Sequence, residues 1–293
     1  MKLSHLYNRI VAFGIDKDPR KNKTAILAYA DSAVLWGKSD TQVKKVLVGI
    51  DIEASEILLA DSIRARQGLD LVISHHPEGK AYAALADVMR LQVDILIKAG
   101  IPKSVAGELL EERQREVARR ISPANHMRAV DAAKLLNIPF MCVHTPADNQ
   151  VSSFIQGVLQ KAKPKKVQDV IDILGKIPEY KIASANSAGP RIILGNPKRP
   201  VGKILVEMTG GTEGNKDVYD KLYRAGVRTL VSMHLSEEHF KKVKDANLNV
   251  VVAGHISSDN LGLNLILDRI EREEKLSIME CSGFRRVSRN KGA

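Results

Sequence analysis

The chain has 293 residues, of which 44% are apolar and 27% charged, with 20 glycines and 11 prolines. This composition excludes a disordered, collagenous or low-complexity chain, and no apolar run reaches the roughly 18–20 residues that a membrane helix needs. The only cysteines, Cys142 and Cys281, are too few for a disulfide framework, so we expect a cytoplasmic protein with no membrane partner.

The net charge is +11, from 45 Lys and Arg against 34 Asp and Glu. A basic surface favours anionic partners such as phosphorylated small molecules, nucleic acid or acidic protein patches. Aromatic residues make up only 4% and do not interleave with the densest basic stretches, 161–166 and 285–291, so no stacking platform for single strands is present. We therefore expect a small anionic molecule, or a simply solvated basic surface, ahead of nucleic acid.

The first regular elements form a predicted βαβ unit. Apolar strands are expected at residues 45–51 and 69–74, with an amphipathic helix at 54–66 between them. Continuous apolar strands of this kind are typical of a parallel sheet that is covered on both faces.

Residues 80–137 are predicted to be helical. One helix at 81–98 breaks at Gly100-Ile101-Pro102, a charged helix follows at 104–120, and Ser122 with Pro123 predicts the cap and first position of a third.

The rest of the chain continues the alternation and shows no internal repeat. The expected strands are 138–143, 191–194, 203–208, 228–233, 249–253 and 277–281. The expected helices are 151–161, 217–225, 237–246 and 263–274. The chain is therefore predicted to be an α/β protein.

Unusual polar residues follow several of these strands, where ligands collect in open α/β sheets. The first strand ends at Asp51, and the second ends in His75 and His76. Neighbouring residues on an extended strand point to opposite faces, so the two histidines share one site only if the chain bends before Pro77. The alternative is one buried, hydrogen-bonded imidazole and one exposed imidazole.

Two further segments pair a histidine with an aspartate four residues later, His144 with Asp148 and His255 with Asp259. Each aspartate has a simpler interpretation, since Asp148 could cap a helix and Asp259 could complement a helix dipole. Taken together, histidine nitrogens and carboxylate oxygens are the ligand mixture of Zn, Mn or Fe at hydrolytic sites. Five such ligands suit two divalent metals better than one tetrahedral metal.

The segments 73–77, 144–148 and 253–259 resemble, in the same order, the three signature segments of the NIF3-like family, also called GTP cyclohydrolase 1 type 2 homologues or NGG-one-interacting factor 3-like proteins. The resemblance runs from about residue 45 to 270. It implies a two-lobed α/β fold of βαβ units, with mostly parallel or mixed sheets flanked by helices. It also implies two divalent metals in a crevice and a ring-shaped homohexamer. The implied ligands are His75, His76, Asp148, His255 and Asp259, with His144 as a further ligand or the proton-transfer group.

Three departures from the family pattern are visible. Asp259 stands where the family usually has glutamate, residues 33–37 match the family's early Trp-Asp-Asn segment poorly, and the stretch between His76 and His144 is longer than usual. The resemblance also divides the chain into a metal-binding lobe, 1–150 plus 250–293, and a second lobe at 151–249. The helical insertion at about 80–137 could cover or reshape the crevice.

The leading hypothesis is a metal-dependent hydrolase that acts on a phosphorylated or nucleotide-like small molecule, with His144 moving a proton and basic residues holding the substrate. The alternatives are a non-catalytic metal-binding, metal-handling or regulatory protein, and a ring that binds nucleic acid. Weaker candidates are His234 as an acid or base, His239, and the glycine-rich segment 207–214, for which an ordinary tight turn is preferred over an anion site. Cys142 is interpreted as a core thiol.

Overall fold

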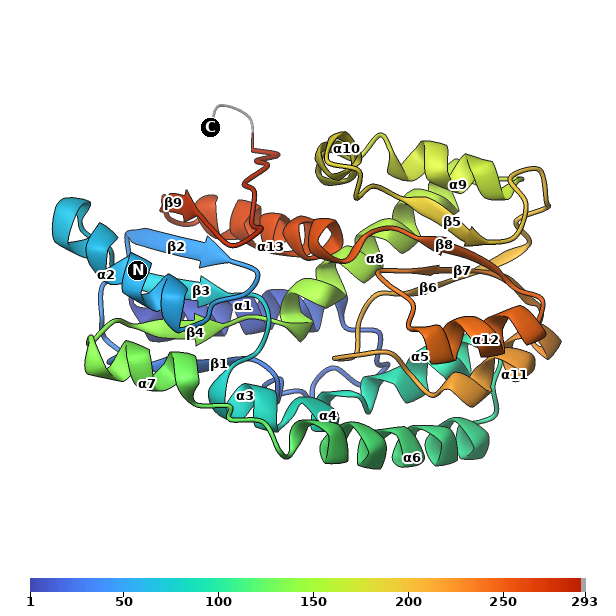
Figure 1. Cartoon of the computed structure of the whole chain (residues 1–293), viewed down its shortest axis with the longest axis horizontal. Coiled ribbons are helices and arrows are strands. Elements are labelled where there is room, and N and C mark those ends of the chain that lie inside the picture. The colour runs from blue at the N-terminus through green and yellow to red at the C-terminus, as the bar shows by residue number, and fades with distance from the viewer. Residues whose placement is uncertain (291–293) are drawn as a thin grey trace.

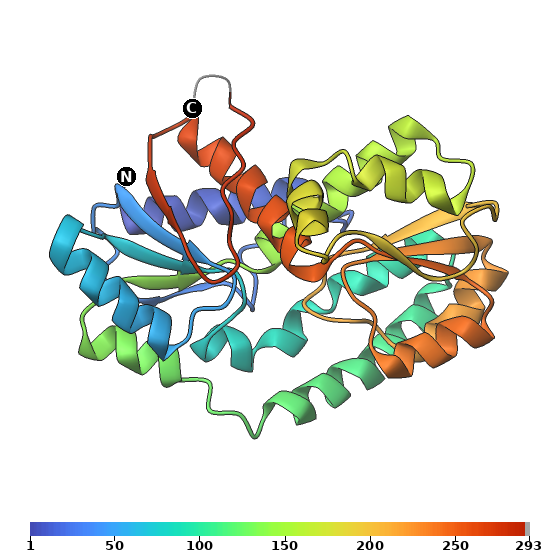
Figure 2. The ribbon, with the colours of Figure 1, turned by 45° about the horizontal axis from the view of Figure 1, so that its top comes forward.

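The computed structural model of the protein describes residues 1–290. It contains two β-sheets that lie side by side, each flanked by helices (Figures 1 and 2). The first sheet has the order β1-β4-β3-β2-β9, in which β1 is antiparallel to β4 and the other neighbours are parallel. Its strands are β1 (Ala33–Trp36), β2 (Lys45–Gly49), β3 (Leu71–Ser74), β4 (Phe140–Cys142) and β9 (Ser277–Glu280).

The second sheet has the order β5-β8-β7-β6, with β5 antiparallel to β8 and the other pairs parallel. Its strands are β5 (Arg191–Leu194), β6 (Lys203–Glu207), β7 (Val227–Ser232) and β8 (Asn249–Val252). These mixed sheets, with helices packed on them, confirm the predicted α/β class.

The helices of the first part of the chain are α1 (Leu3–Lys17), α2 (Ala54–Gln67), α3 (Gly79–Ala83), α4 (Leu85–Val88), α5 (Leu91–Ala99), α6 (Lys103–Ile121) and α7 (Arg128–Leu135). Those that follow β4 are α8 (Thr145–Ala162), α9 (Val167–Leu174), α10 (Pro178–Ala185), α11 (Tyr219–Arg224), α12 (Glu237–Asp245) and α13 (His255–Glu271), with a short 3₁₀ turn at Lys216–Val218. Within residues 1–290, none of these helices is long and apolar enough to cross a membrane.

Helices α8 and α13 contact each other and join the two sheets (Figure 1). In α8, Ala147 belongs to the core of the first sheet, whereas Val151, Ile155 and Leu159 belong to the core of the second. The i, i+4 spacing of the last three gives the helix one apolar stripe. Both helices begin at the crevice between the sheets, so their first turns lie where ligands of an α/β sheet collect.

Several predicted boundaries are wrong. Helix α8 begins at Thr145 and not at residue 151, and α13 begins at His255 and not at residue 263. The first turns of both helices carry polar residues, which hide the apolar periodicity, yet most of these residues are buried: Asp148 and Asp259 face the crevice, and Asn149 packs against α1. The predicted helix at 81–98 is broken into α3, α4 and α5. The elements α1, β1, α9 and α10 were not predicted.

The predicted helix start at Ser122 and Pro123 is wrong as well. Ser122 keeps a helical backbone as the residue that follows Ile121 and caps the end of α6, and its hydroxyl donates to the carbonyl oxygen of Arg119 rather than capping a new helix. The chain then turns, and α7 begins only at Arg128.

The helices of the insertion at 80–137 serve both sheets (Figure 2). Helix α7 packs Ala129 and Val130 into the core of the first sheet. Helices α5 and α6 instead place Ala99 and Ala106 in the core of the second sheet, next to Leu230 of β7. The insertion therefore connects the two halves of the molecule, and the predicted lobe boundaries stay a prediction.

Candidate metal centre

The crevice brings together the six residues that the sequence singled out. They come from the carboxyl ends of β3 and β4 and from the first turns of α8 and α13: His75, His76, His144, Asp148, His255 and Asp259. His76 and His255 are partly exposed, and the other four are buried.

Three of the histidines have one ring nitrogen held by an acceptor behind them. Nδ1 of His75 donates to the carbonyl oxygen of Val143 over 3.0 Å, and Nδ1 of His76 donates to Oδ1 of Asp51 over 2.6 Å. Nδ1 of His144 donates to Oδ2 of Asp31 over 2.8 Å. This directs each Nε2 towards the crevice, where it can bind a metal ion once it has lost its proton, as is usual for metal-binding histidines.

The aspartates lie among these Nε2 atoms. Oδ1 of Asp259 is 3.4 Å from Nε2 of His75, and its Oδ2 is 3.6 Å from Nε2 of His76 and 3.7 Å from Nε2 of His255. Although aspartate is shorter than the glutamate that the family usually has here, Asp259 reaches three histidines. One of its oxygens faces His75, and the other faces His76 and His255. Asp148 lies 3.5 Å from Nε2 of His75 and 3.8 Å from Nε2 of His144.

Four of these atoms are buried and lack a hydrogen-bond partner among residues 1–290: Nε2 of His75, Oδ1 of Asp148 and both carboxylate oxygens of Asp259. Buried polar groups are almost always satisfied, because an unpaired one costs about 1–3 kcal/mol. The ligand atoms form three overlapping groups, within each of which all atoms lie within 4.8 Å of one another. The donor set and its unpaired atoms fit a metal ion. The simpler capping interpretation of Asp148 fails, because Asp148 lies inside the first turn of α8 and the N-cap position is occupied by His144.

The charges of the cluster point the same way. Burial lowers the pKa of His75 and His76, but the neighbouring carboxylates reverse this effect and raise the two pKa values to about 10 and about 9. Burial raises the pKa of Asp259, and His75 and His76 overcome it, so the pKa of this carboxyl lies well below its usual range. Without metal, protons on the histidines balance the carboxylates.

One residue of the site escaped the sequence analysis. Asp31 is fully buried and accepts hydrogen bonds from Nδ1 of His144 and, over 2.6 Å, from the hydroxyl of Thr145. Asp31 lies just before β1, a strand that the periodicity did not reveal. The antiparallel pairing of Ala33 with Cys142 brings residue 31 to residue 144. The only sequence signal was its place directly before the poorly matched segment 33–37.

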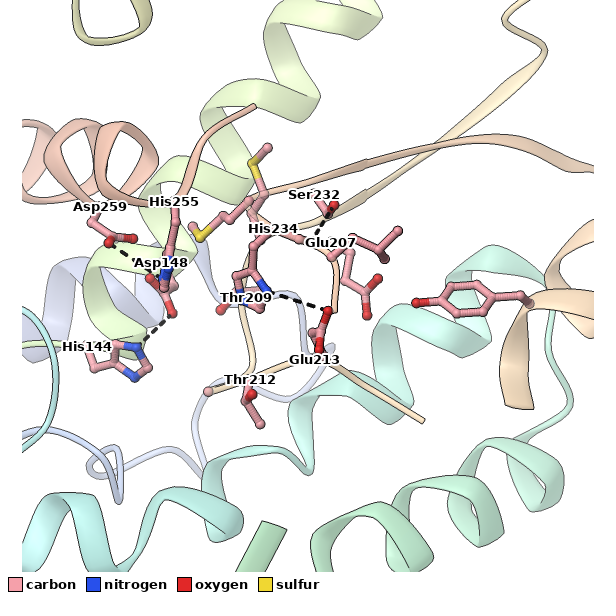
Figure 3. A pocket seen from close by; sticks show the side chains of 15 residues that line it. His144, Asp148, Glu207, Thr209, Thr212, Glu213, Ser232, His234, His255 and Asp259 are labelled. Atoms are coloured by element: carbon pink, nitrogen blue, oxygen red, sulfur yellow. Dashed lines mark hydrogen bonds and ion pairs between the residues drawn. The ribbon is translucent and has the colours of Figure 1, made fainter. Parts of the chain in front are cut away.

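The opposite side of the crevice is built by the second sheet (Figure 3). Glu207 ends β6, and His234 follows β7 with its ring centroid 4.8 Å from that of His255. Nδ1 of His234 lies 3.5 Å from Oε1 of Glu213. Burial raises the pKa of Glu213, but His234, His239 and the backbone N–H of Ser236 lower it further, to about 2.

The glycine-rich segment is a tight loop held by the insertion. Gly210 and Gly211 have φ values of +108° and +82°, and a Cβ on Gly210 would lie 2.6 Å from Cγ of Gln92. The Gln92 amide donates to the carbonyl oxygens of Gly210 and Thr212 over 2.9 and 2.7 Å. The 3₁₀ turn at Lys216–Val218 and then the short helix α11 follow, and no long helix starts at the loop, so the structure favours a turn over an anion site.

His234 thus lies beside the cluster, whereas His239 and Cys142 are buried in the packing and take no part in it. His239 is buried, and its Nδ1 lies 2.7 Å from the Tyr219 hydroxyl. Cys142 is buried in the sheet, and burial raises the pKa of its thiol to about 12, as suits a core thiol.

Comparison with protein-family models and with curated protein sequences finds no match. Among solved structures, a NIF3 superfamily protein from Sphaerobacter thermophilus has 29% sequence identity and a TM-score of 0.77, over 94% of this chain and 97% of that one. This similarity supports the resemblance of the chain to the NIF3-like family. Two more distant structures match this NIF3-like chain in fold alone. They are reduced HcgD from Methanocaldococcus jannaschii (15% identity, TM-score 0.58) and TTHA1606 from Thermus thermophilus (15%, 0.53), each covering 96% of this chain and 97% of the other.

Proposed function

We propose that this NIF3-like chain binds two divalent cations and hydrolyses a small phosphorylated or nucleotide-like substrate. The observation that supports the proposal is the convergence of buried, unpaired ligand atoms from His75, Asp148 and Asp259. Such a cluster is unfavourable by itself, because each unpaired atom has lost its hydration without gaining a partner. A bound cation removes that cost.

Two of the three ligand groups share Asp259. One consists of His75, Asp148 and Asp259, and the other consists of His76, His255 and Asp259. We assign one cation to each group, with Asp259 contributing to both. Mixed nitrogen and oxygen ligands suit Zn, Mn or Fe.

Divalent cations at these positions would supply Lewis acidity, which polarises a phosphoryl group or a ring carbon and lowers the pKa of water towards neutrality. The chain supplies orientation, since Asp51 and Asp31 hold His76 and His144 through their Nδ1 atoms. Arg128 is the one arginine or lysine among the described residues that line the crevice. An anionic substrate would therefore be held mainly by the cations, with Arg128 at the rim.

Two roles fit His144. His144 forms a ligand group with His75 and His76, and it also borders the part of the crevice that a substrate would enter. Metal content separates the two roles, because a ligand is needed for metal affinity and a proton-transfer group is not.

The first experiment is elemental analysis of the untagged protein and of a His75→Ala, Asp259→Ala double variant. We expect about two equivalents per chain in the parent and almost none in the variant. A His5→Ala, Asp40→Ala variant is the matched control, because it removes the same residue types from exposed positions. A parent that stays free of metal after reconstitution with Zn, Mn or Fe would contradict the metal assignment.

Turnover is tested on a panel of phosphoesters and nucleotides with the metal-loaded parent. Hydrolysis that disappears with the metal supports the enzyme. Equal turnover by the metal-depleted variant would rule out the mechanism. Metal that passes to an acceptor protein, with no hydrolysis of any panel member, would favour the metal-handling alternative. The hexameric ring stays a prediction, for which sedimentation gives the mass.

A further inference from the structure

A second cavity lies away from the metal centre, at the outer side of β6. It is a groove of about 710 Å³ between α8 and α5, and the end of α1 closes it. Figure 1 shows β6 with α8 and α5 on either side. None of the six ligand candidates lines the groove, so it is separate from the proposed function.

The floor of the groove is an open sheet edge. In the described part of the chain, β6 is the last strand of its sheet and pairs with β7 alone. Within residues 1–290, no other segment makes a backbone hydrogen bond to Lys203–Glu207. An edge strand presents unpaired N–H and C=O groups, which form a template for another extended segment. Five residues span about 17 Å at the rise of a β-strand.

The walls of the groove are basic. Five lysines line it: Lys17, Lys23, Lys98, Lys163 and Lys203. Natural edges often carry a lysine on the strand as protection against aggregation. Here only Lys203 belongs to β6, whereas the others come from α1 and its following loop, from α5, and from the end of α8. Protection of the edge strand against aggregation explains Lys203 but not the four lysines that reach the groove from other elements.

Most of this positive charge is not neutralised. The ammonium groups of Lys23 and Lys203 donate to the carbonyl oxygens of Asp16 and Ala99 over 2.6 and 2.7 Å, and that of Lys98 donates to the carbonyl oxygen of Pro19. A carbonyl oxygen satisfies a hydrogen bond but carries no compensating charge.

The two aspartates of the groove are already engaged. Asp18 is bound by the guanidinium group of Arg20 over 2.9 and 2.8 Å. Asp16 accepts from Arg269 over 3.0 Å and lies 3.4 Å from Nζ of Lys17, so among the five lysines Lys17 is partly neutralised. The groove therefore attracts negative charge.

The lining favours a peptide over a nucleic acid. No Phe, Tyr or Trp is among its described residues, so bases have no ring on which to stack. Apolar side chains such as Ile95, Leu159 and Ile204 share the lining with the lysines. An extended peptide with alternating acidic and apolar residues matches both features, and its backbone matches the open edge. We propose that the groove binds an extended acidic segment of a partner protein, which adds to β6 as a further strand.

The test uses the full chain and a fluorescein-labelled seven-residue peptide of alternating Glu and Val, with fluorescence anisotropy as the measurement. A Lys98→Glu, Lys163→Glu variant is expected to bind about tenfold more weakly, or worse, because two attractive charges become repulsive. The control is Lys38→Glu, Lys241→Glu, which changes the net charge equally at exposed positions outside the groove. The control is expected to bind the peptide as tightly as the parent. An equal loss of affinity in the groove variant and the control would mean that the peptide is attracted by net charge alone.

Two N-methylated peptides test strand addition, one methylated at the odd and one at the even residues. Both peptides keep their charge, but only one of them loses the N–H groups that would face β6. That peptide is expected to bind about tenfold more weakly than the other. Equal binding of the two would overturn strand addition. Polyphosphate or single-stranded DNA that displaces a peptide of this kind would then identify a simple anion groove. A lower sedimentation mass of the lysine variant, with no peptide binding by the parent, would instead place a second copy of the chain on the edge.

Discussion

In the first turn of α13, Asp259 keeps both carboxylate oxygens without a hydrogen-bond partner among residues 1–290, whereas across the crevice, in the loop after β6, Glu213 is fully engaged. Glu213 accepts from the backbone N–H of Ser236 over 2.7 Å and lies within 4 Å of both His234 and His239. Both carboxylates line the same crevice. The half of the molecule that holds the ligand candidates therefore needs a bound ligand to satisfy its buried charge. The half that is built on the second sheet satisfies its own. A carboxylate without partners is therefore expected to bind metal, whereas a carboxylate with partners is expected to stabilise the fold opposite the metal centre.

The largest expected effect comes from removing one charge in each half. Asp259→Asn keeps the shape of the side chain but removes the negative charge shared by three histidines, so we expect it to abolish metal binding. Glu213→Gln is expected to keep the parent's metal content. Metal added at about 1,000 times its dissociation constant should stabilise the parent and Glu213→Gln by about 4 kcal/mol, with no effect on Asp259→Asn. Elemental analysis measures the metal content, and thermal unfolding measures the stabilisation. A parent-like metal content in Asp259→Asn would refute the comparison.

The next largest effect concerns the acceptor behind His144. Asp31→Asn removes the carboxylate that holds Nδ1 of His144. We expect metal affinity to fall about 10–100-fold, the usual cost of losing such a partner. Titration against a chelator of known affinity measures the change. Unchanged affinity together with a loss of turnover would instead assign proton transfer to His144.

In the second half, the glycine-rich loop depends on one buried amide. Gln92→Ala leaves the carbonyl oxygens of Gly210 and Thr212 without this donor. We expect the free energy of unfolding to fall by about 1–3 kcal/mol, with the metal content unchanged. Urea denaturation gives the first value. Gln67→Ala, at an exposed position, is the control and should stay within about 0.5 kcal/mol of the parent. Loss of metal in Gln92→Ala would show that the two halves are not independent.

The smallest effect is a pH dependence of the second half. The pKa of Glu213 is lowered to about 2 in the folded protein from its ordinary value of 4.5. A group with a lowered folded pKa stabilises the fold above its unfolded pKa and loses that contribution as the pH falls. The stability of the metal-free parent relative to Glu213→Gln should therefore decrease as the pH drops from about 5 towards 2. Urea midpoints across this range test the sign, and a constant difference between the two proteins would contradict the ionised Glu213.

Much of the first half was visible in the sequence, because its signals are local. An apolar run followed directly by His75 and His76 marks a strand and its end, and the spacing of four between His255 and Asp259 is one helical turn. The first turns of α8 and α13 were missed for the same local reason, since buried polar residues look like a loop when their burial is unknown.

The sequence by itself determined the α/β class, the candidate ligands and the family resemblance, because strand periodicity and residues at strand ends depend on short stretches of chain. Only the tertiary structure decided which nitrogen of each histidine faces the crevice, since that depends on acceptors as distant as Asp31, Asp51 and Val143. It also decided that α5 and α6 support the second sheet and that β6 is left as an open edge. Such features arise from pairing and packing between segments far apart in the chain, which no local pattern records.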